Sequence, residues 1–330
     1  MAKTVQEDFG IKEAMLDRVA HLHQNLPGFM KDTVTKQFKR DGIVIGVSGG
    51  IDSAVIATLA TQALGNDHVH GLILPEKESN PSSKELAVRL CKKLKIPFTE
   101  VPITPMITSF GIYDRKMALM KELFPQYDPE VHSTNLFLPS GISSERQFSV
   151  PSIRLSDKTG SLATKRLSAS QYLTLMSLQN VKQRTRMIVL YMQAEKMNYV
   201  VSGTTNKSEL LTGYFVKYGD GGVDIEPIAN MYKLQVFKLA EMLGVDSKII
   251  SRSPSPDTWS HFTSDEDFYL RMPYEVLDVL LYAEEHKIPE KIVKKNLGLD
   301  SEQIAGARKH IQSMRKASEL LQLLPPVYMK

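Results

Sequence analysis

The segment at residues 43–53 constrains the fold of this chain more than any other part of the sequence. Apolar residues typical of a buried strand run directly into Ser48-Gly49-Gly50-Ile51-Asp52-Ser53, and an alanine-rich helical pattern follows. A glycine turn between a strand and a helix directs backbone N–H groups and the positive end of the helix dipole toward an anion. The segment therefore predicts a phosphate-binding loop.

This loop differs from a Walker loop, because the Gly-Lys-Ser/Thr ending is missing and Asp52 stands where the lysine would be. Phosphates would repel a carboxylate among phosphate-binding amides unless a cation lay between them. The loop therefore indicates a magnesium-bound nucleotide. The simpler interpretation, a glycine-rich turn that opens an ordinary helix, is disfavoured because strand, loop and helix follow in the required order.

Strand and helix patterns alternate after an N-terminal region that looks helical, with a break expected at Pro27-Gly28. We expect strands at residues 43–47, 69–74, 98–103 and 199–202, with helices at 53–64 and 82–94 between the first three strands. Such alternation predicts an α/β fold, a doubly wound parallel sheet flanked by helices. A ligand would bind at the carboxyl ends of the strands, where the loop at residues 48–53 lies.

The periodic pattern lapses at residues 125–170 into Ser, Thr, Pro and Gly with scattered charges. A compact domain rarely carries so long an irregular stretch, so we interpret it as a lid or a partly disordered insertion. Helical periodicity returns at residues 170–197, and most of the C-terminal third is helical. We therefore expect a single domain over residues 1–330 with an irregular insertion at about 125–170.

Composition excludes several classes of protein. The 41 basic and 37 acidic residues are too evenly balanced to suggest a nucleic-acid-binding protein. The single cysteine, Cys91, lies in the apolar pattern of a predicted helix, which favours core packing over a disulfide or a catalytic thiol. No apolar run approaches the roughly 20 residues needed to span a bilayer, and no signal-peptide pattern opens the chain. We expect a cytoplasmic protein that binds neither nucleic acid nor membrane.

Three further segments carry polar chemistry. Asn180 and Arg184 lie one turn apart on a predicted helix, where arginine could clamp a phosphate or carboxylate, although a solvated helix face fits equally well. A glycine turn at Gly203 introduces a polar run to Glu209. The run at residues 213–228 is too dense in glycine and acid for a helix or strand, and it predicts a loop shaped for a ligand.

These segments resemble a known family. Ser-Gly-Gly-x-Asp-Ser after a first strand resembles the signature of the ATP pyrophosphatases (PP-loop enzymes), whose fold is adenine nucleotide alpha hydrolase-like. The helix at residues 180–186, the Asn-Lys-Ser-Glu turn at 206–209 and the Lys-Tyr-Gly-Asp-Gly-Gly-x-Asp loop at 217–224 are similar to segments of ammonia-dependent NAD synthetases. The resemblance covers about residues 42–274.

The resemblance implies roles for the residues that match the motifs. Magnesium would be held by Asp52 and Glu209, deamido-NAD by Arg184, Lys217 and Asp224, and catalysis would involve Asp52 and Lys233. The residues implied to contact ATP are Gly46, Val47, Ser48, Gly49, Gly50, Ile51, Asp52, Ser53, Thr204, Lys233 and Ser255.

The resemblance also implies an activity: a ligase of NAD biosynthesis that forms a carbon–nitrogen bond. The carboxylate of deamido-NAD would attack the α phosphorus of magnesium-bound ATP, giving an acyl adenylate and pyrophosphate. Ammonia would then displace AMP and yield NAD. A homodimer is expected, because the family places its second substrate at a two-fold interface, and ammonia would come free or from a separate glutaminase.

Departures from the family pattern leave two alternatives open. Leu320 and Leu321 stand where the family has a polar His-Lys pair that contacts deamido-NAD. A paralogue that amidates another carboxylate, or a non-catalytic nucleotide-binding protein, would also fit the sequence. If deamido-NAD is the substrate, basic residues of the insertion would replace the lost contacts by closing over the ligand as a lid: Arg154, Lys158, Lys165 or Arg166.

Overall fold

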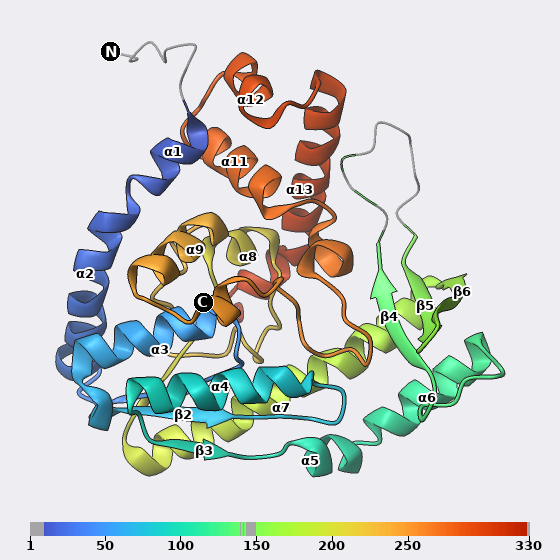
Figure 1. The fold of residues 1–330 in the computed structure, drawn as a ribbon, viewed down its shortest axis with the longest axis horizontal. Helices are drawn as coiled ribbons and strands as arrows, with labels where there is room; N and C mark the ends of the chain where they lie inside the picture. Colours follow the sequence, from blue (N-terminus) through green and yellow to red (C-terminus); the bar gives the residue numbers. More distant parts are fainter. Residues whose placement is uncertain (1–9, 139, 141, 143–149, 329–330) are drawn as a thin grey trace.

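A four-stranded parallel sheet forms the centre of the molecule, shown in Figure 1 with helices around it. The computed structural model describes residues 10–138, 140, 142 and 150–328. The strands stand in the order β3, β2, β1, β7, and all neighbouring strands are parallel. Their bounds are Ile43–Gly46 for β1, Val69–Ile73 for β2, Phe98–Glu100 for β3 and Val200–Ser202 for β7.

The sheet is covered on both faces because its strands are apolar on both sides. Ile43 and Ile45 pack in one buried cluster with residues of α3 (Ile51–Leu64) and α4 (Pro81–Leu94). Val44, which points the other way, packs in a second cluster with residues of α7 (Ala169–Met197). The predicted doubly wound α/β fold is confirmed, and Cys91 is buried in the first cluster as expected.

The N-terminal helices differ from the expectation in the position of their break. Helix α1 spans Ile11–Leu16 and α2 spans Val19–Asp32, and a π-helical turn follows at Thr33–Gln37. The break predicted at Pro27-Gly28 is wrong, since α2 continues through Pro27. Leu26 and Met30 on either side are buried in the core. Their packing holds the segment helical although proline removes one backbone hydrogen bond.

The remaining helices complete the outer layers and a C-terminal helical group in which α11, α12 and α13 pack with α1. Among the described residues, no helix is both long and apolar enough to cross a membrane. The bounds are α5 Thr104–Ser109, α6 Ile112–Leu123, α8 Lys207–Thr212, α9 Lys233–Met242, α10 Ser247–Ile250, α11 Tyr274–Glu285, α12 Glu290–Leu297 and α13 Ser301–Gln322, with a 3₁₀ turn at Asn66–His68 and a π-helical turn at Glu266–Leu270.

The insertion is more ordered than the sequence suggested. A three-stranded antiparallel sheet lies beside α6, with strands β4 (Ser133–Phe137), β5 (Ser152–Asp157) and β6 (Gly160–Arg166) (Figure 1). Its strands are short and rich in Ser and Thr, so their alternation was hidden, although Leu136 and Leu155 are fully buried. The rest of the expected irregular stretch includes residues 139, 141 and 143–149, which lie outside the described residues.

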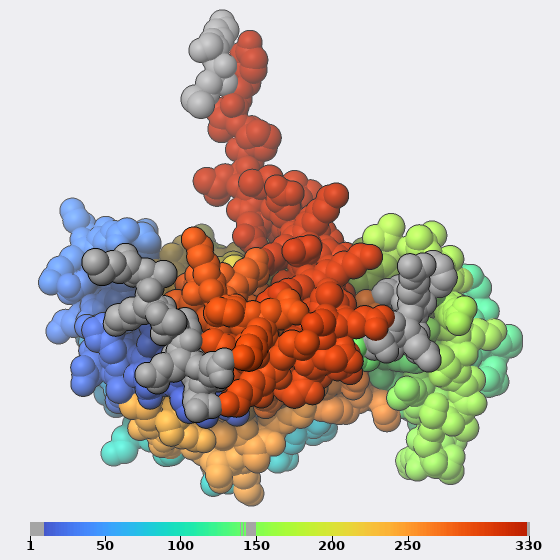
Figure 2. Space-filling view, turned by 90° about the horizontal axis from the view of Figure 1, so that it is seen from above, coloured from blue at the N-terminus to red at the C-terminus, as the bar shows by residue number. Residues whose placement is uncertain are grey.

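The C-terminal end of the chain projects from the body of the molecule. Figure 2 shows this segment, which follows α13, extending away from the surface. Leu324, Val327 and Tyr328 are all highly exposed. Leu321, one residue before the end of α13, instead lines the cavity described below.

Candidate functional site

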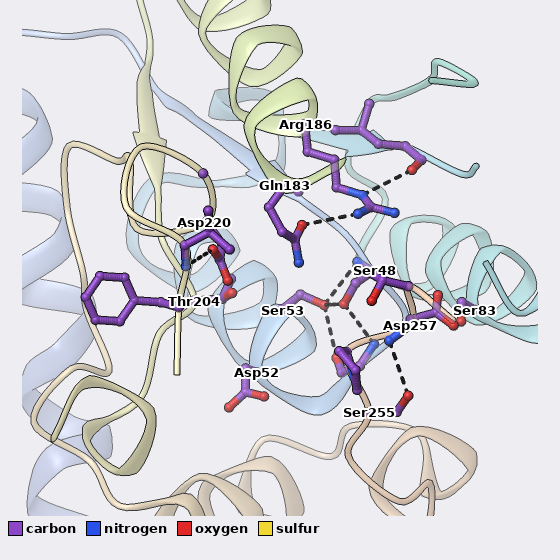
Figure 3. A pocket seen from close by; sticks show the side chains of 18 of the residues that line it. Ser48, Asp52, Ser53, Ser83, Gln183, Arg186, Thr204, Asp220, Ser255 and Asp257 are labelled. Carbon is purple, nitrogen blue, oxygen red and sulfur yellow. Dashed lines mark hydrogen bonds between the residues drawn. The ribbon is translucent and has the colours of Figure 1, made fainter. Parts of the chain in front are cut away.

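A cavity of about 700 Å³ opens at the carboxyl ends of β1, β2 and β7 (Figure 3). Its lining includes most of the loop at residues 46–53, the segment after β2 and the residues after β7. This is the position that a parallel α/β sheet provides for a ligand. Of the residues expected to contact ATP or magnesium, Thr204, Glu209, Lys233 and Ser255 line it together with the loop.

The predicted phosphate loop is held in shape by its own hydroxyl groups. Ser53 Oγ donates to the carbonyl of Gly50 at 3.0 Å and lies 3.0 Å from Ser48 Oγ. Gly49 has a φ of 77°, and a Cβ there would press against the backbone carbonyl of Ser83 in α4. Glycine is required here for a left-handed turn and for close packing on α4. Gly49 itself does not line the cavity.

Two acids and a lysine meet beside this loop. The ammonium of Lys233 lies 2.6 Å from Asp52 Oδ2 and 3.2 Å from Glu209 Oε1. Asn206 donates from Nδ2 to Asp52 Oδ1 at 3.0 Å, and Asn206 also forms a capping box with Glu209 at the start of α8. Helices α3, α8 and α9 therefore begin at a common point, and each contributes a side chain from its first turn.

The electrostatics of this point favour an additional cation. Burial raises the pKa of Glu209 to about 8, with repulsion from Asp52 and Asp265 adding to the effect and Lys233 opposing it. Burial also raises the pKa of Asp265, whose carboxylate accepts hydrogen bonds from Tyr214 and Tyr274 at 2.8 and 3.0 Å. Three carboxyl groups thus lie around a single ammonium, and a bound divalent cation would favour the ionised forms of Glu209 and Asp265.

The donor set fits magnesium bound together with a nucleotide. Within the described part of the chain, no group of three or more His, Cys, Asp or Glu side chains is arranged to hold a metal ion. Asp52 and Glu209 share the ammonium of Lys233, which brings two carboxylates close together. Magnesium is commonly held by one or two carboxylates while phosphates and waters complete its shell.

Aromatic side chains form another wall of the cavity that the sequence did not predict. Tyr214 and Tyr269 stack with ring centroids 4.9 Å apart, and Phe215 and Phe268 also line the cavity. Phe268 is also buried against the insertion sheet, in one cluster with Leu136 and Leu155.

Arg186 is a second cavity residue that sequence reasoning left unassigned. Its guanidinium donates to Gln183 Oε1 at 3.2 Å and to Ser79 Oγ at 3.5 Å, and burial lowers its pKa (Figure 3). The available signal was its place in the polar helix motif, two residues after Arg184. Because residues two apart on a helix face different directions, Arg186 faces the cavity whereas Arg184 is exposed.

The three residues expected to hold deamido-NAD lie outside the cavity. Lys217 Nζ donates to the carbonyls of Leu320 and Leu323 at 2.9 and 2.7 Å, and Arg184 donates to the carbonyl of Lys217 at 3.3 Å. Asp224 accepts from Val201 N at 2.8 Å. Their expected role stays a prediction, since these contacts describe the free chain.

The basic residues of the insertion do not line the cavity, and their closure over a ligand as a lid stays a prediction. The guanidinium of Arg154 lies 4.6 Å from the ring centroid of Phe137, and the ammonium of Lys165 lies 5.7 Å from that of Phe124. Neither these two residues nor Lys158 or Arg166 lines the cavity. The insertion sheet instead supports the outer side of the cavity wall, where Leu138 N donates to the carbonyl of Asp267 at 3.0 Å.

Comparisons with known proteins agree on one family. A family model described as NAD synthase matches residues 22–123 and 145–322. The NH(3)-dependent NAD(+) synthetase of Mesorhizobium japonicum is 37% identical over 298 residues, covering 89% of this chain and 93% of the relative. A solved structure described as an NMN synthetase from Francisella tularensis has a TM-score of 0.63 at 26% identity, covering 97% of this chain and 99% of that one.

A second solved structure supports the fold alone. The NH3-dependent NAD synthetase from Campylobacter jejuni has a TM-score of 0.62 at 24% identity, and the match covers 94% of this chain and 99% of that chain. The family model omits residues 124–144, which contain β4 of the insertion sheet. Strands β5 and β6 fall within the matched residues, so the internal departure from the family model is confined to the first part of the insertion.

Proposed function

This chain belongs to the NAD synthase family, and on that premise we propose that it is an ATP-dependent ligase that amidates deamido-NAD with ammonia. The products are NAD, AMP and pyrophosphate. The observation that carries the proposal is a single cavity in which a phosphate-type loop, the Asp52–Lys233–Glu209 group and an aromatic wall meet. These are the parts needed to bind a nucleotide triphosphate beside an aromatic carboxylate.

The ATP half of the reaction rests on charge and position. The loop at residues 46–53 would bind phosphate oxygens through its N–H groups and the N-terminus of α3. Asp52 and Glu209 would hold magnesium, which neutralises phosphate charge when it is bound. Lys233, already at the same point, would stabilise the negative charge of the departing pyrophosphate. The chain thereby supplies positioning and electrostatic stabilisation for attack by the carboxylate oxygen on the α phosphorus.

The acceptor half would use the aromatic wall. Tyr214, Phe215 and Tyr269 offer flat apolar surfaces against which a pyridine ring packs favourably. Ammonia would attack the carbonyl carbon of the acyl adenylate, the bond from that carbon to the AMP oxygen would break, and the surplus proton would pass to solvent. Leu321 lies in the lining, so an apolar contact stands where the family has a polar side chain.

The position of Arg184 supports a homodimer. Arg184 lies on an exposed face of α7 that also carries Ile188 and Met192, one and two turns further along. Ile188 is 56% exposed and Met192 is 59% exposed. A second copy covering this face would bury both apolar residues and would bring Arg184 beside the site of that second copy. The predicted contacts of Arg184 with deamido-NAD would then form between subunits.

The test is a reaction of the purified chain with magnesium, ATP, ammonium and deamido-NAD, with NAD, AMP and pyrophosphate measured. Equal amounts of the three products support the proposal. Because one similar structure is described as an NMN synthetase, nicotinate mononucleotide should be assayed in parallel. Faster turnover of the mononucleotide would favour the paralogue alternative, and ATP binding without pyrophosphate release would favour the non-catalytic one. Glutamine replaces ammonium in a third reaction to establish the nitrogen source.

A further inference from the structure

The ammonium of Lys182 joins three segments in the interior of the protein. Lys182 lies in α7 and is 1% exposed. Its Nζ donates to Glu76 Oε1 at 2.8 Å, to Glu78 Oε2 at 2.6 Å and to the backbone carbonyl of Thr258 at 2.9 Å. All three donor positions of the ammonium are therefore used, which is what a buried charge requires.

The acceptors belong to two loops that border the cavity described above. Glu76 lies in the segment after β2, and Thr258 lies in the segment between α10 and the π-helical turn at Glu266–Leu270; both residues line the cavity. A second bond joins the same two loops, since Asn80 N donates to Asp257 Oδ1 at 3.0 Å. Lys182 thus connects both loops to one rigid helix.

The next inward-facing residue of α7 also contacts the segment after β2. Arg186, one turn after Lys182, donates to the carbonyl of Leu74 at 3.4 Å and lines the cavity. On the other loop, Asp257 N donates to Ser255 Oγ at 3.2 Å, and Ser255 is expected to contact ATP. Figure 3 shows Arg186, Ser255 and Asp257 around the same pocket. A displacement at Lys182 would therefore reach cavity residues on both sides.

The charges of the cluster are balanced. Lys116 of α6 pairs with Glu78, and Tyr113 donates to Glu76 Oε2 at 2.6 Å. Two lysines and two glutamates therefore form a neutral buried group. Such a group adds little to stability compared with apolar packing of the same volume. We therefore explain the group by the positions in which it holds its neighbours. Lys182 is the lysine of the pair that reaches across to the carbonyl of Thr258.

We propose that Lys182 is a positioning residue for the ATP half of the site, holding the loop after β2 and the loop at residues 253–258 in the arrangement that binds ATP. The inference rests on the proposed function, because it takes the cavity to be the ATP site. It assigns Lys182 no contact with the substrates. Its effect passes through Glu76 and Thr258, so losing Lys182 weakens ATP binding more than it slows turnover at saturating ATP.

Two charge-balanced double variants test this. Lys182→Met with Glu78→Gln removes one positive and one negative charge, breaks the bond to Thr258 and leaves the cavity residue Glu76 unchanged. Lys116→Met with Glu78→Gln is the matched control, because it removes the same charges from the same cluster but keeps the bonds from Lys182 to Glu76 and Thr258. Methionine also keeps an apolar chain near the Trp259 ring, which lies 5.2 Å from the Lys116 ammonium. The single Lys182→Met variant is avoided because it leaves a buried carboxylate unpaired.

The dissociation constant for magnesium-bound ATP is measured by calorimetry, and KM and kcat are measured by pyrophosphate release. We expect the Lys182 pair to raise the dissociation constant and KM for ATP at least about tenfold with kcat changed less than about threefold, and the control to change none of them more than about twofold. The fluorescence of Trp259, the chain's single tryptophan and the neighbour of Thr258, should shift to the red in the free Lys182 variant.

Three outcomes would overturn the proposal: equal losses of ATP affinity in both double variants, unchanged affinity in the Lys182 pair, or failure of the Lys182 pair alone to fold. The last would assign Lys182 to stability instead. ATP binding is measured separately from NAD formation, so the two proposals fail separately. If the wild-type chain binds ATP without forming NAD, the proposed reaction fails, and the comparison of affinities still decides the role of Lys182.

Discussion

Lys233 Nζ lies 2.6 Å from Asp52 Oδ2, and the two residues stand in the first turns of different helices, α9 and α3. The positive end of the α9 dipole disfavours an ammonium at this position. Burial also disfavours its charge, yet the carboxylates of Asp52 and Glu209 raise the pKa of Lys233 above its usual value. The ammonium is thus held charged at the place where phosphate and metal are expected to bind.

The first prediction concerns Asp52→Asn. Asparagine keeps one of the two oxygens, so it can accept from Asn206 or from Lys233 but not from both, while Lys233 retains its pairing with Glu209. The free energy of unfolding should therefore fall by about 1–3 kcal/mol. Pyrophosphate release should fall at least about 100-fold, because one of two metal carboxylates is lost. Near wild-type turnover at saturating magnesium would show that the assignment of the loop is wrong.

The second prediction is a pH dependence of magnesium-bound ATP affinity. Burial raises the pKa of Glu209 to about 8, so the free protein holds a proton there below that pH. Cation binding favours the ionised carboxylate and must release this proton. Affinity should therefore rise with pH, by up to about tenfold per pH unit, and level off above about pH 8. Calorimetry from about pH 6 to about pH 9, which is about two units below to about one unit above the pKa of Glu209, measures the change.

Glu226 provides a control for this pH dependence. Burial raises its pKa to about 8 as well, but it accepts from Thr205 N at 3.2 Å and lies outside the cavity lining. Between the ordinary pKa of a glutamate and about 8, the folded chain holds protons at Glu209 and Glu226 that the unfolded chain has lost. The free energy of unfolding should therefore fall as pH rises through this window.

Glu226→Gln should make this fall in stability shallower, by up to about 1.4 kcal/mol per pH unit, while the pH dependence of ATP affinity stays as in the wild type. Urea unfolding at several pH values and calorimetry measure the two effects. A Glu226 variant that loses the pH dependence of ATP affinity would refute the assignment of that dependence to Glu209.

The sheet and its loop were predictable because their signals are local. The signal of a buried strand followed by glycine turns and a helix lies in consecutive residues, as at residues 43–53. Parallel strand pairing then places this loop at the carboxyl-end edge of the sheet. The position of Glu209 beside Asp52 also followed, although only through the family resemblance. The composition and spacing of these residues alone do not predict that Lys233 lies beside the carboxylates of Asp52 and Glu209.

The remaining features depend on contacts between distant segments. In the sequence, Lys182 is one polar residue in a predicted helix. Its hydrogen bond to the carbonyl of Thr258 joins residues that are 76 positions apart. The insertion strands are short and polar, and their order comes from pairing with one another and from packing against α6 and the segment with Phe268. The helix break predicted at Pro27 was wrong for the same reason, because tertiary packing keeps α2 helical despite a local helix breaker.

The third prediction concerns Lys217→Ala. If Lys217 binds deamido-NAD, its loss should raise KM for deamido-NAD at least about tenfold and leave KM for ATP within about twofold, because Lys217 lies outside the cavity. The variant also removes two hydrogen bonds to the end of α13, so the comparison is truncation after Gln322, which removes the Leu323 acceptor and keeps Lys217. Equal damage to both substrates would contradict the separation of the site into two halves.

The last prediction is that the chain is a homodimer whose interface includes the exposed face of α7 with Arg184, Ile188 and Met192. Met192→Lys would place a charge in that apolar contact, and burial of an unpaired charge is costly, so the dimer dissociation constant should rise at least about 100-fold. Light scattering should then give a monomer at working concentration. Phe29→Lys is the control, because Phe29 is 48% exposed, near the 59% of Met192, but lies on α2, which packs on the opposite face of the sheet from α7. The Met192 variant should still bind ATP with the wild-type constant, since Met192 is outside the cavity, while its KM for deamido-NAD rises because Arg184 loses the opposite subunit. A wild-type monomer with intact NAD formation would rule out the shared site and leave Arg184 to act within one chain.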